Sequence, residues 1–155
     1  YYMAGEYELS QKELDKLYSI DPNSEIYHSA SLNLYEAKGD EDNAFKHYLN
    51  KFQFVGYSEQ EIKEATIAFS QGGLKKLSFW LANVKNEQED VGQYLPPFST
   101  ARYHIGAGEY EKAIDLLELA VKNKERDRVW LNADPKYAPL KKFPRFNNLL
   151  KSIGF

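Results

Sequence analysis

The side chains that most often carry chemistry lack the spacing that a reaction or a metal site needs. The three histidines, His28, His47 and His104, form no HExxH or HxxxH pattern. His104 occupies a position where an aromatic ring is expected in the core, so packing is favoured over a ligand role. No serine lies in a GxSxG sequence, and the abundant carboxylates form no pair that indicates acid–base catalysis.

The remaining candidates for metal or phosphate binding are also incomplete. The chain has no cysteine, which excludes disulfides, cysteine-ligated zinc and thiol nucleophiles. The string GDEDNAF, residues 39–45, begins like a calcium loop but lacks the later glycine and glutamate, so we interpret its acids as helix-start residues. The glycine pairs in QGGL and IGAGEY lack the preceding strand of a phosphate-binding loop. The sequence therefore predicts no catalytic site, metal or cofactor, and no enzyme.

Length and composition indicate a folded, soluble protein, with one domain as the default. The 155 residues are 43% hydrophobic and 28% charged. No apolar run approaches the roughly 18 to 20 residues of a membrane-spanning helix, so we expect no membrane insertion. The cytoplasm is the favoured compartment, and the periplasmic side of a membrane-anchored regulator stays open.

A repeat of about 34 residues organises most of the chain. Its turn glycines are Gly5, Gly39, Gly73 and Gly108, spaced by 34, 34 and 35 residues. An aromatic ring stands four residues before each glycine. A small residue stands five residues after it and a third repeated position nine residues after it, so these last two positions have helical i, i+4 spacing. The rings are Tyr1, Tyr35, Phe69 and His104, the small residues are Ser10, Ala44, Ser78 and Ala113, and the third set is Leu14, Tyr48, Ala82 and Leu117. The pattern predicts antiparallel helix pairs that meet along this face, with left-handed glycines ending the helices.

This pattern resembles the tetratricopeptide repeat, which has the same period and the same ring, glycine, small and aromatic positions. The resemblance covers residues 1–127 as a partial unit 1–24 and units 25–58, 59–93 and 94–127. It implies an all-α fold, a tetratricopeptide-like α-α right-handed superhelix with a C-terminal capping helix. Because the first unit starts inside a helix, we expect the chain to be the C-terminal part of a larger protein.

The end of the chain, residues 128–155, is predicted to cap the last repeat. Pro144 suits the first turn of a helix, and Gly154 suits its end. Between them the apolar residues fall at i, i+3, i+4 and i+7: Phe146, Leu149, Leu150 and Ile153. A solenoid leaves an uncovered apolar face at its last repeat, which such a stripe can cover. Pro135 and Pro139 break the preceding segment, so short helix and loop are expected there.

The tail is also basic, which raises the alternative of nucleic-acid binding. Residues 136–155 carry a net charge of +5, leaving −8 for residues 1–135. Lysines and aromatic rings can contact phosphates and stack on bases. However, Phe146 belongs to the apolar stripe, and lysines suit the solvated outside of a cap. We therefore expect no direct nucleic-acid contact, and we expect Arg145 to form a salt bridge back to the last repeat.

The tail is also similar to the ending of a group of bacterial tetratricopeptide regions, W-L-x-x-D-P-x-F-x-P-L-x-x-D-P-R-F. The matching residues are Trp130, Leu131, Asp134, Pro135, Pro139, Leu140, Pro144, Arg145 and Phe146. Phe143 replaces the second aspartate of the pattern, so a helix cap is expected to be lost there. The resemblance implies the C-terminal region of a multidomain regulator whose other domain is a winged-helix, protein-kinase or adenylate cyclase domain.

In this superfamily the first helix of each unit lines a concave groove, which implies a set of binding residues here. The groove positions would be Ser29, Asn33 and Glu36, then Lys63, Ile67 and Ser70, then Phe98, Arg102 and Ile105. Asn33, Lys63 and Arg102 can hydrogen-bond a peptide backbone or carboxylate, with Ile67 and Phe98 as apolar contacts. An inert, solvated inner face is an equally weighted interpretation of the same residues.

The function expected from these features is non-catalytic. We expect a protein–protein interaction or scaffold region of a bacterial signalling or transcription-regulatory protein, with a protein, peptide or subunit as partner. Two alternatives stay open: a ligand-sensing regulatory domain, in which a small molecule shifts the curvature of the stack, and a self-association module that forms a homo-oligomer.

Overall fold

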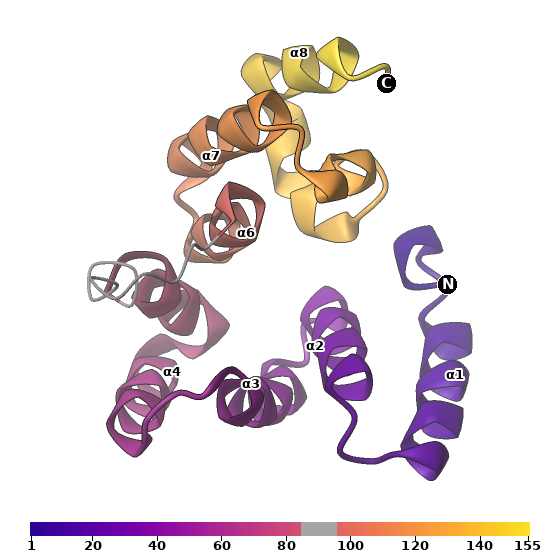
Figure 1. The fold of residues 1–155 in the computed structure, drawn as a ribbon, viewed down its shortest axis with the longest axis vertical. Coiled ribbons are helices and arrows are strands. Elements are labelled where there is room, and N and C mark those ends of the chain that lie inside the picture. The colour runs from indigo at the N-terminus through magenta and orange to yellow at the C-terminus, as the bar shows by residue number, and fades with distance from the viewer. Residues whose placement is uncertain (85–95) are drawn as a thin grey trace. The chain divides into compact units, whose positions relative to one another are not determined.

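A computed structural model describes residues 1–84 and 96–155, and within them the regular structure is helical with no strand, as predicted (Figure 1). The described chain forms two compact units, residues 1–70 and residues 71–155. The boundary falls beside a break in a helix at Gly72 and Gly73. No helix in the described residues is long and apolar enough to cross a membrane. The predicted superhelical arrangement of all units stays a prediction.

The first unit, residues 1–70, contains three whole helices and the first part of a fourth. Its elements are the 3-10 turn η1 (Tyr2–Ala4) and the helices α1 (Tyr7–Ile20), α2 (Glu25–Lys38) and α3 (Glu41–Val55), followed by residues 59–70 of α4 (Glu59–Phe79). Leu34, Ala44 and Phe52 are at most 2% exposed and form the centre of the α2–α3 pair. Asp40 accepts a hydrogen bond from the Asn43 amide at 3.2 Å, so this acid is a helix cap, as interpreted from the sequence.

The second unit, residues 71–155, contains the last helix pair and the tail. Its elements are the end of α4, the π-helical turn η2 (Trp80–Val84), α6 (Pro97–Ala107), α7 (Tyr110–Lys122), the 3-10 helices η3 (Arg126–Trp130) and η4 (Pro135–Lys142), and α8 (Pro144–Ser152). The proline-broken segment is thus short helix and loop, as predicted. Phe143 stands at the N-cap of α8 and makes no side-chain cap, so the lost cap is confirmed.

The turn glycines of the repeat take left-handed backbone conformations where they end a helix. Gly5, Gly39 and Gly108 have φ of 76°, 71° and 82° and follow η1, α2 and α6, as the pattern predicts. Gly73, with φ 62° and ψ −153°, produces a kink inside α4 together with Gly72. The helix end predicted at Gly73 is therefore present as a kink, after which residues 74–79 form the next helical segment.

The face predicted from the residues five and nine positions after each glycine packs inward. Ala44, Ser78 and Ala113 are at most 2% exposed, whereas Ser10 is half-buried, and the third set, Leu14, Tyr48, Ala82 and Leu117, is at most 5% exposed. Tyr1, the ring of the first unit, departs from the pattern and is 60% exposed.

A close approach of two backbones explains the small residue at position 78. A Cβ atom built on Gly106 of α6 would lie 2.8 Å from the Cβ of Ser78, closer than real Cβ contacts. A larger side chain at either position would push the two segments apart. The sequence interpretation that a small residue permits close helix packing is therefore confirmed in this unit.

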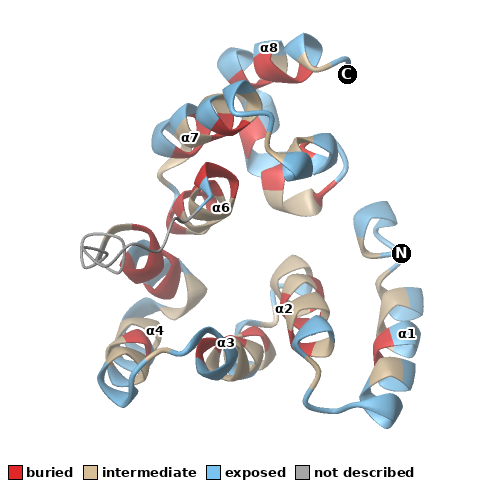
Figure 2. Cartoon of the chain, in the orientation of Figure 1, coloured by how far each residue is buried: buried red, intermediate tan, exposed pale blue. Residues whose placement is uncertain are grey.

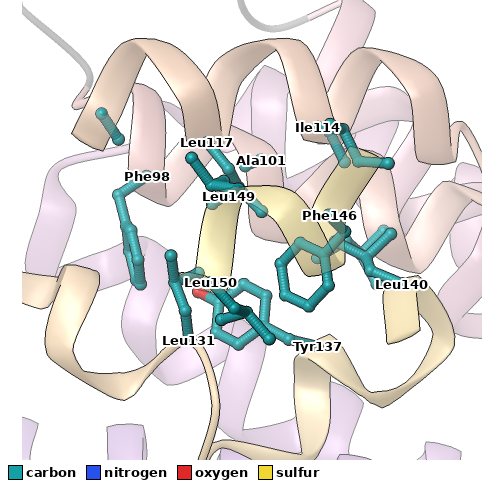
Figure 3. Packing of buried hydrophobic residues seen from close by; sticks show 13 residues of the cluster. Phe98, Ala101, Ile114, Leu117, Leu131, Tyr137, Leu140, Phe146, Leu149 and Leu150 are labelled. Atoms are coloured by element: carbon teal, nitrogen blue, oxygen red, sulfur yellow. The ribbon is translucent and has the colours of Figure 1, made fainter. Parts of the chain in front are cut away.

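The tail and the last helix pair share one hydrophobic core. Its buried members are Phe98, Ala101, Ile105, Ala113, Ile114, Leu117, Ala120, Leu131, Tyr137, Leu140, Phe146, Leu149 and Leu150. Figure 3 shows the labelled side chains of η4 and α8 pointing towards those of α6 and α7, and the buried residues of α7 and α8 lie on their facing sides (Figure 2). The predicted apolar stripe of the tail is thus confirmed as a packing surface.

Candidate protein-binding faces of the first helices

The cap occupies the face of α6 that the repeat pattern assigns to the groove. Phe98, expected to contact a bound peptide, is 5% exposed, and its ring centroid lies 5.5 Å from that of Tyr137 in η4. Ile105, on the same face, is also 5% exposed. The backbone amide of Phe98 donates to Glu125 at 3.2 Å, which fixes the start of α6. Phe98 is therefore a core residue here rather than an open apolar contact, because the tail folds over it.

Arg102, the second groove candidate on α6, is bound within the chain. Its Nη1 atom donates to Oδ2 of Asp134 at 2.6 Å, and the guanidinium lies 5.8 Å from the centre of the Tyr137 ring. Asp134 is 6% exposed and also accepts from the Lys136 amide at 2.9 Å, which caps η4. Burial raises the pKa of Tyr137, so its side chain stays neutral beside this ion pair. Arg102 thus holds the cap in place.

Arg145 attaches the cap on its outer side, as predicted. Its guanidinium contacts three carboxylates of α7: Glu118 at 2.6 Å, Asp115 at 2.7 Å and Glu111 at 3.6 Å. These residues fall at helical spacing along one face of α7. The arginine after Pro144 is therefore a structural contact between α8 and α7 and not a ligand contact.

The corresponding face of α2, in the first unit, is open. A hollow of about 430 Å³ is lined by Glu25, Ile26, Ser29, Ala30 and Asn33 of this helix. Ser29 and Asn33 are two of the predicted groove positions, and both line this hollow. Glu36, the third, accepts a hydrogen bond from the Tyr48 hydroxyl at 2.9 Å and is tied to α3. Ile26, which the sequence interpretation did not single out, is 72% exposed.

The two candidates on the first part of α4 are also at the surface. Lys63 is exposed, and Ile67, four residues further on the same helix face, is 47% exposed. Phe69 instead turns towards α3 and stacks on Phe45, with ring centroids 4.0 Å apart. Of the five predicted contact residues, the first unit therefore presents Asn33, Lys63 and Ile67, whereas Phe98 and Arg102 serve the core and cap of the second unit.

A pair of histidines in the first unit was missed by the sequence analysis. His28 of α2 and His47 of α3 approach with their Nδ1 atoms 2.9 Å apart, although the residues are 19 positions apart. They lie eleven residues before and eight residues after the turn glycine Gly39, so antiparallel pairing about that turn was the available signal. A search for histidines one helical turn apart could not find them.

The environment of the pair disfavours positive charge. Burial, opposed by the Pro22 carbonyl and Asp21, lowers the pKa of His28. Burial, His28 and Lys46 lower the pKa of His47 to about 4. Across residues 1–84 and 96–155, no three histidine, aspartate or glutamate side chains gather as metal ligands. The pair is therefore a contact between two neutral imidazoles.

Comparison with known proteins gave no relative: no family model, no curated protein and no solved structure matches this chain.

Proposed function

We propose that this chain is a non-catalytic protein-binding region whose contact surface is the open face of α2 and residues 59–70 of α4. The observation that carries the proposal is Ile26, an aliphatic side chain 72% exposed beside a hollow on a helix whose two leucines, Leu32 and Leu34, are buried. Exposed apolar side chains next to polar ones are typical of surfaces that bind protein segments. Ile67, also exposed, supplies a second apolar contact in the same unit.

The chemistry of these faces suits a peptide rather than a reaction. The Ser29 hydroxyl can hydrogen-bond a peptide backbone, and Lys63 can pair with a carboxylate. Residues 1–70 contain thirteen acidic and six basic residues, a net charge of −7. Charge of this sign favours encounter with a basic segment. The partner that fits is a peptide or protein segment with an apolar anchor and an overall positive charge.

The tail supports a place for this region in a larger regulator. Its motif resembles the ending of bacterial winged-helix, kinase and cyclase regulators, and Asp134, Arg145 and Phe146 of that motif have structural roles in the cap. In such a protein the first unit would bind the partner, and the partner's binding would be relayed to the output domain. The assignment of this region to a larger regulator rests on the sequence motif of the tail.

The experiment is selection of random 12-residue peptides on the immobilised chain, followed by affinity measurement on the selected peptides. We expect basic sequences with an aliphatic or aromatic anchor, and we expect Ile26→Glu to weaken their binding at least tenfold. Leu119→Glu is the matched control, because Leu119 is 42% exposed on α7 of the other unit. The proposal would be contradicted if no peptide were selected, or if both variants lost peptide affinity to the same extent.

The ligand-sensing alternative has narrower support. The hollow of about 430 Å³ is large enough for a small molecule, but its lining comes from one helix. Ligand sites usually bury most of the ligand surface between several elements. The open face of α2 therefore favours a protein segment. Self-association, the other alternative, is tested by light scattering over a concentration series, where a constant monomer mass excludes it.

A further inference from the structure

The contact between His28 and His47 joins the two helices of the α2–α3 pair. The Nδ1 atoms lie 2.9 Å apart and the ring centroids 5.2 Å apart. His28 is 7% exposed, and the Tyr27 ring packs edge-on against both imidazoles, with centroids 5.1 and 5.5 Å away. Tyr35 stacks on His47 at 5.5 Å. The contact is thus held between aromatic rings on helices that run in opposite directions.

The number of protons on the two rings decides whether this contact is favourable. A neutral imidazole has one N–H donor and one bare nitrogen that accepts, so one Nδ1 donates while the other accepts. Once either ring takes up a second proton, both of its nitrogens are donors. A pair with one charged ring keeps the hydrogen bond, because that ring donates from Nδ1 and the neutral ring accepts with its own proton on Nε2. Protonation of both rings places two N–H groups and two positive charges in contact.

The neighbouring groups compensate a positive charge on the pair only in part. Asp21 acts on His28 alone, while Lys46, beside His47, opposes a positive charge there. Asp15 and Asp40 add to burial in raising the pKa of Tyr35, whose ring stacks on His47. The groups that face the pair from the α1–α2 turn, α2 and α3 therefore leave the neutral form favoured.

We propose that the His28–His47 pair is a proton-sensitive latch, so that acidification that charges both rings weakens the packing of α2 on α3. The sign follows from the pKa values of both imidazoles, which are lower in the folded chain than the ordinary value near 6.5. The unfolded chain therefore binds more protons between pH 6.5 and about 4. The stabilisation of the folded chain by the neutral imidazole pair is complete above pH 6.5 and is lost as the pH falls towards 4.

The latch has a consequence for α2, which also carries the hollow at Ser29 and Asn33. A weakened helix pair would alter the face on which we propose that a partner binds. The latch itself does not depend on that proposal, because the contact and its protonation chemistry exist without any partner.

The test begins with the imidazole signals of the whole chain, followed by NMR between pH 8 and 4. We expect the signals of His28 and His47 to titrate together with a midpoint below 6. Two independent titrations near 6.5 would overturn the proposal. Because this measurement uses the unaltered chain, it does not depend on any variant folding.

A second test of the latch compares thermal unfolding at pH 7.5 and pH 5. His47→Phe keeps a ring for the stack on Tyr35 but cannot take up a proton, so we expect it to lose less stability on acidification than the unaltered chain. For one proton the folding constant should fall by up to tenfold per pH unit within the window. Tyr27→Phe, which leaves both imidazoles in place, should retain the full loss. Equal acid sensitivity of His47→Phe and the unaltered chain would refute the latch.

Discussion

The guanidinium of Arg102 donates to the carboxylate of Asp134 at 2.6 Å, across 32 residues of sequence. The pair joins α6 to the segment that leads into η4, and Asp134 also caps that 3-10 helix. Through this contact the tail covers the face of α6 that a concave groove would otherwise use.

We expect Asp134→Ala to lower the free energy of unfolding by about 2 to 3 kcal/mol, because it leaves a largely buried arginine without its partner. Arg126→Ala, an exposed arginine of η3, should change it by less than about 0.5 kcal/mol. Urea unfolding measures both. A combined Arg102→Met and Asp134→Ala variant that is more stable than Asp134→Ala alone would identify the unpaired charge as the cause.

Gly106→Ala should destabilise the second unit by about 1 to 3 kcal/mol, because the new methyl group meets Ser78. The better helix propensity of alanine, worth about 1 kcal/mol, opposes this loss. Adding Ser78→Gly to Gly106→Ala removes the obstructing side chain and should recover part of the stability. If Gly106→Ala melts at a higher temperature than the unaltered chain, the close approach is wrong.

Phe146→Ala should cost about 3 to 5 kcal/mol, since the ring is fully buried between the cap and the last helix pair. Arg145→Ala should cost less, because its three carboxylate contacts lie at the surface, and its effect should shrink at high salt. Removal of residues 144–155 should lower the melting temperature and promote aggregation. An unchanged melting temperature after this deletion would argue against a cap.

Glu109 should make the second unit sensitive to strong acid. Burial opposes its charge, but hydrogen bonds from Asn83, Lys112 and His104 lower the pKa of its carboxyl to about 2. The contribution of the Glu109 carboxylate to the free energy of unfolding is therefore complete above pH 4.5 and is lost as the pH falls from 4.5 to 2. We expect Glu109→Gln to cost about 1 kcal/mol at pH 7 and to flatten the stability profile in this window. A profile that stays parallel to that of the unaltered chain would contradict this role.

Local regularity explains which features could be predicted from the sequence. The buried positions Ala44 and Ala113 and the stripe from Phe146 to Ile153 follow helical spacing, so the pattern alone indicates which side packs. The turn glycines were also predictable, because Gly39 and Gly108 end helices in a conformation that other residues rarely adopt. The division into two units after residue 70 was not predictable from the period, which continues across it.

Contacts between distant segments explain what was missed. Phe98 and Arg102 follow the groove pattern, but no period within the helix indicates that Tyr137 and Asp134 return to cover them. His28 and His47 meet only after α2 and α3 pair. Such contacts depend on tertiary packing, whereas the spacing rules describe single helices.

The Arg102–Asp134 pair also changes what variation at these positions would mean. In a set of related chains, substitutions at residue 102 should covary with residue 134, because each side chain compensates the charge of the other. Changes in the partner that is bound should instead accompany substitutions at residues 26, 33 and 67, which belong to the proposed binding surface of the first unit.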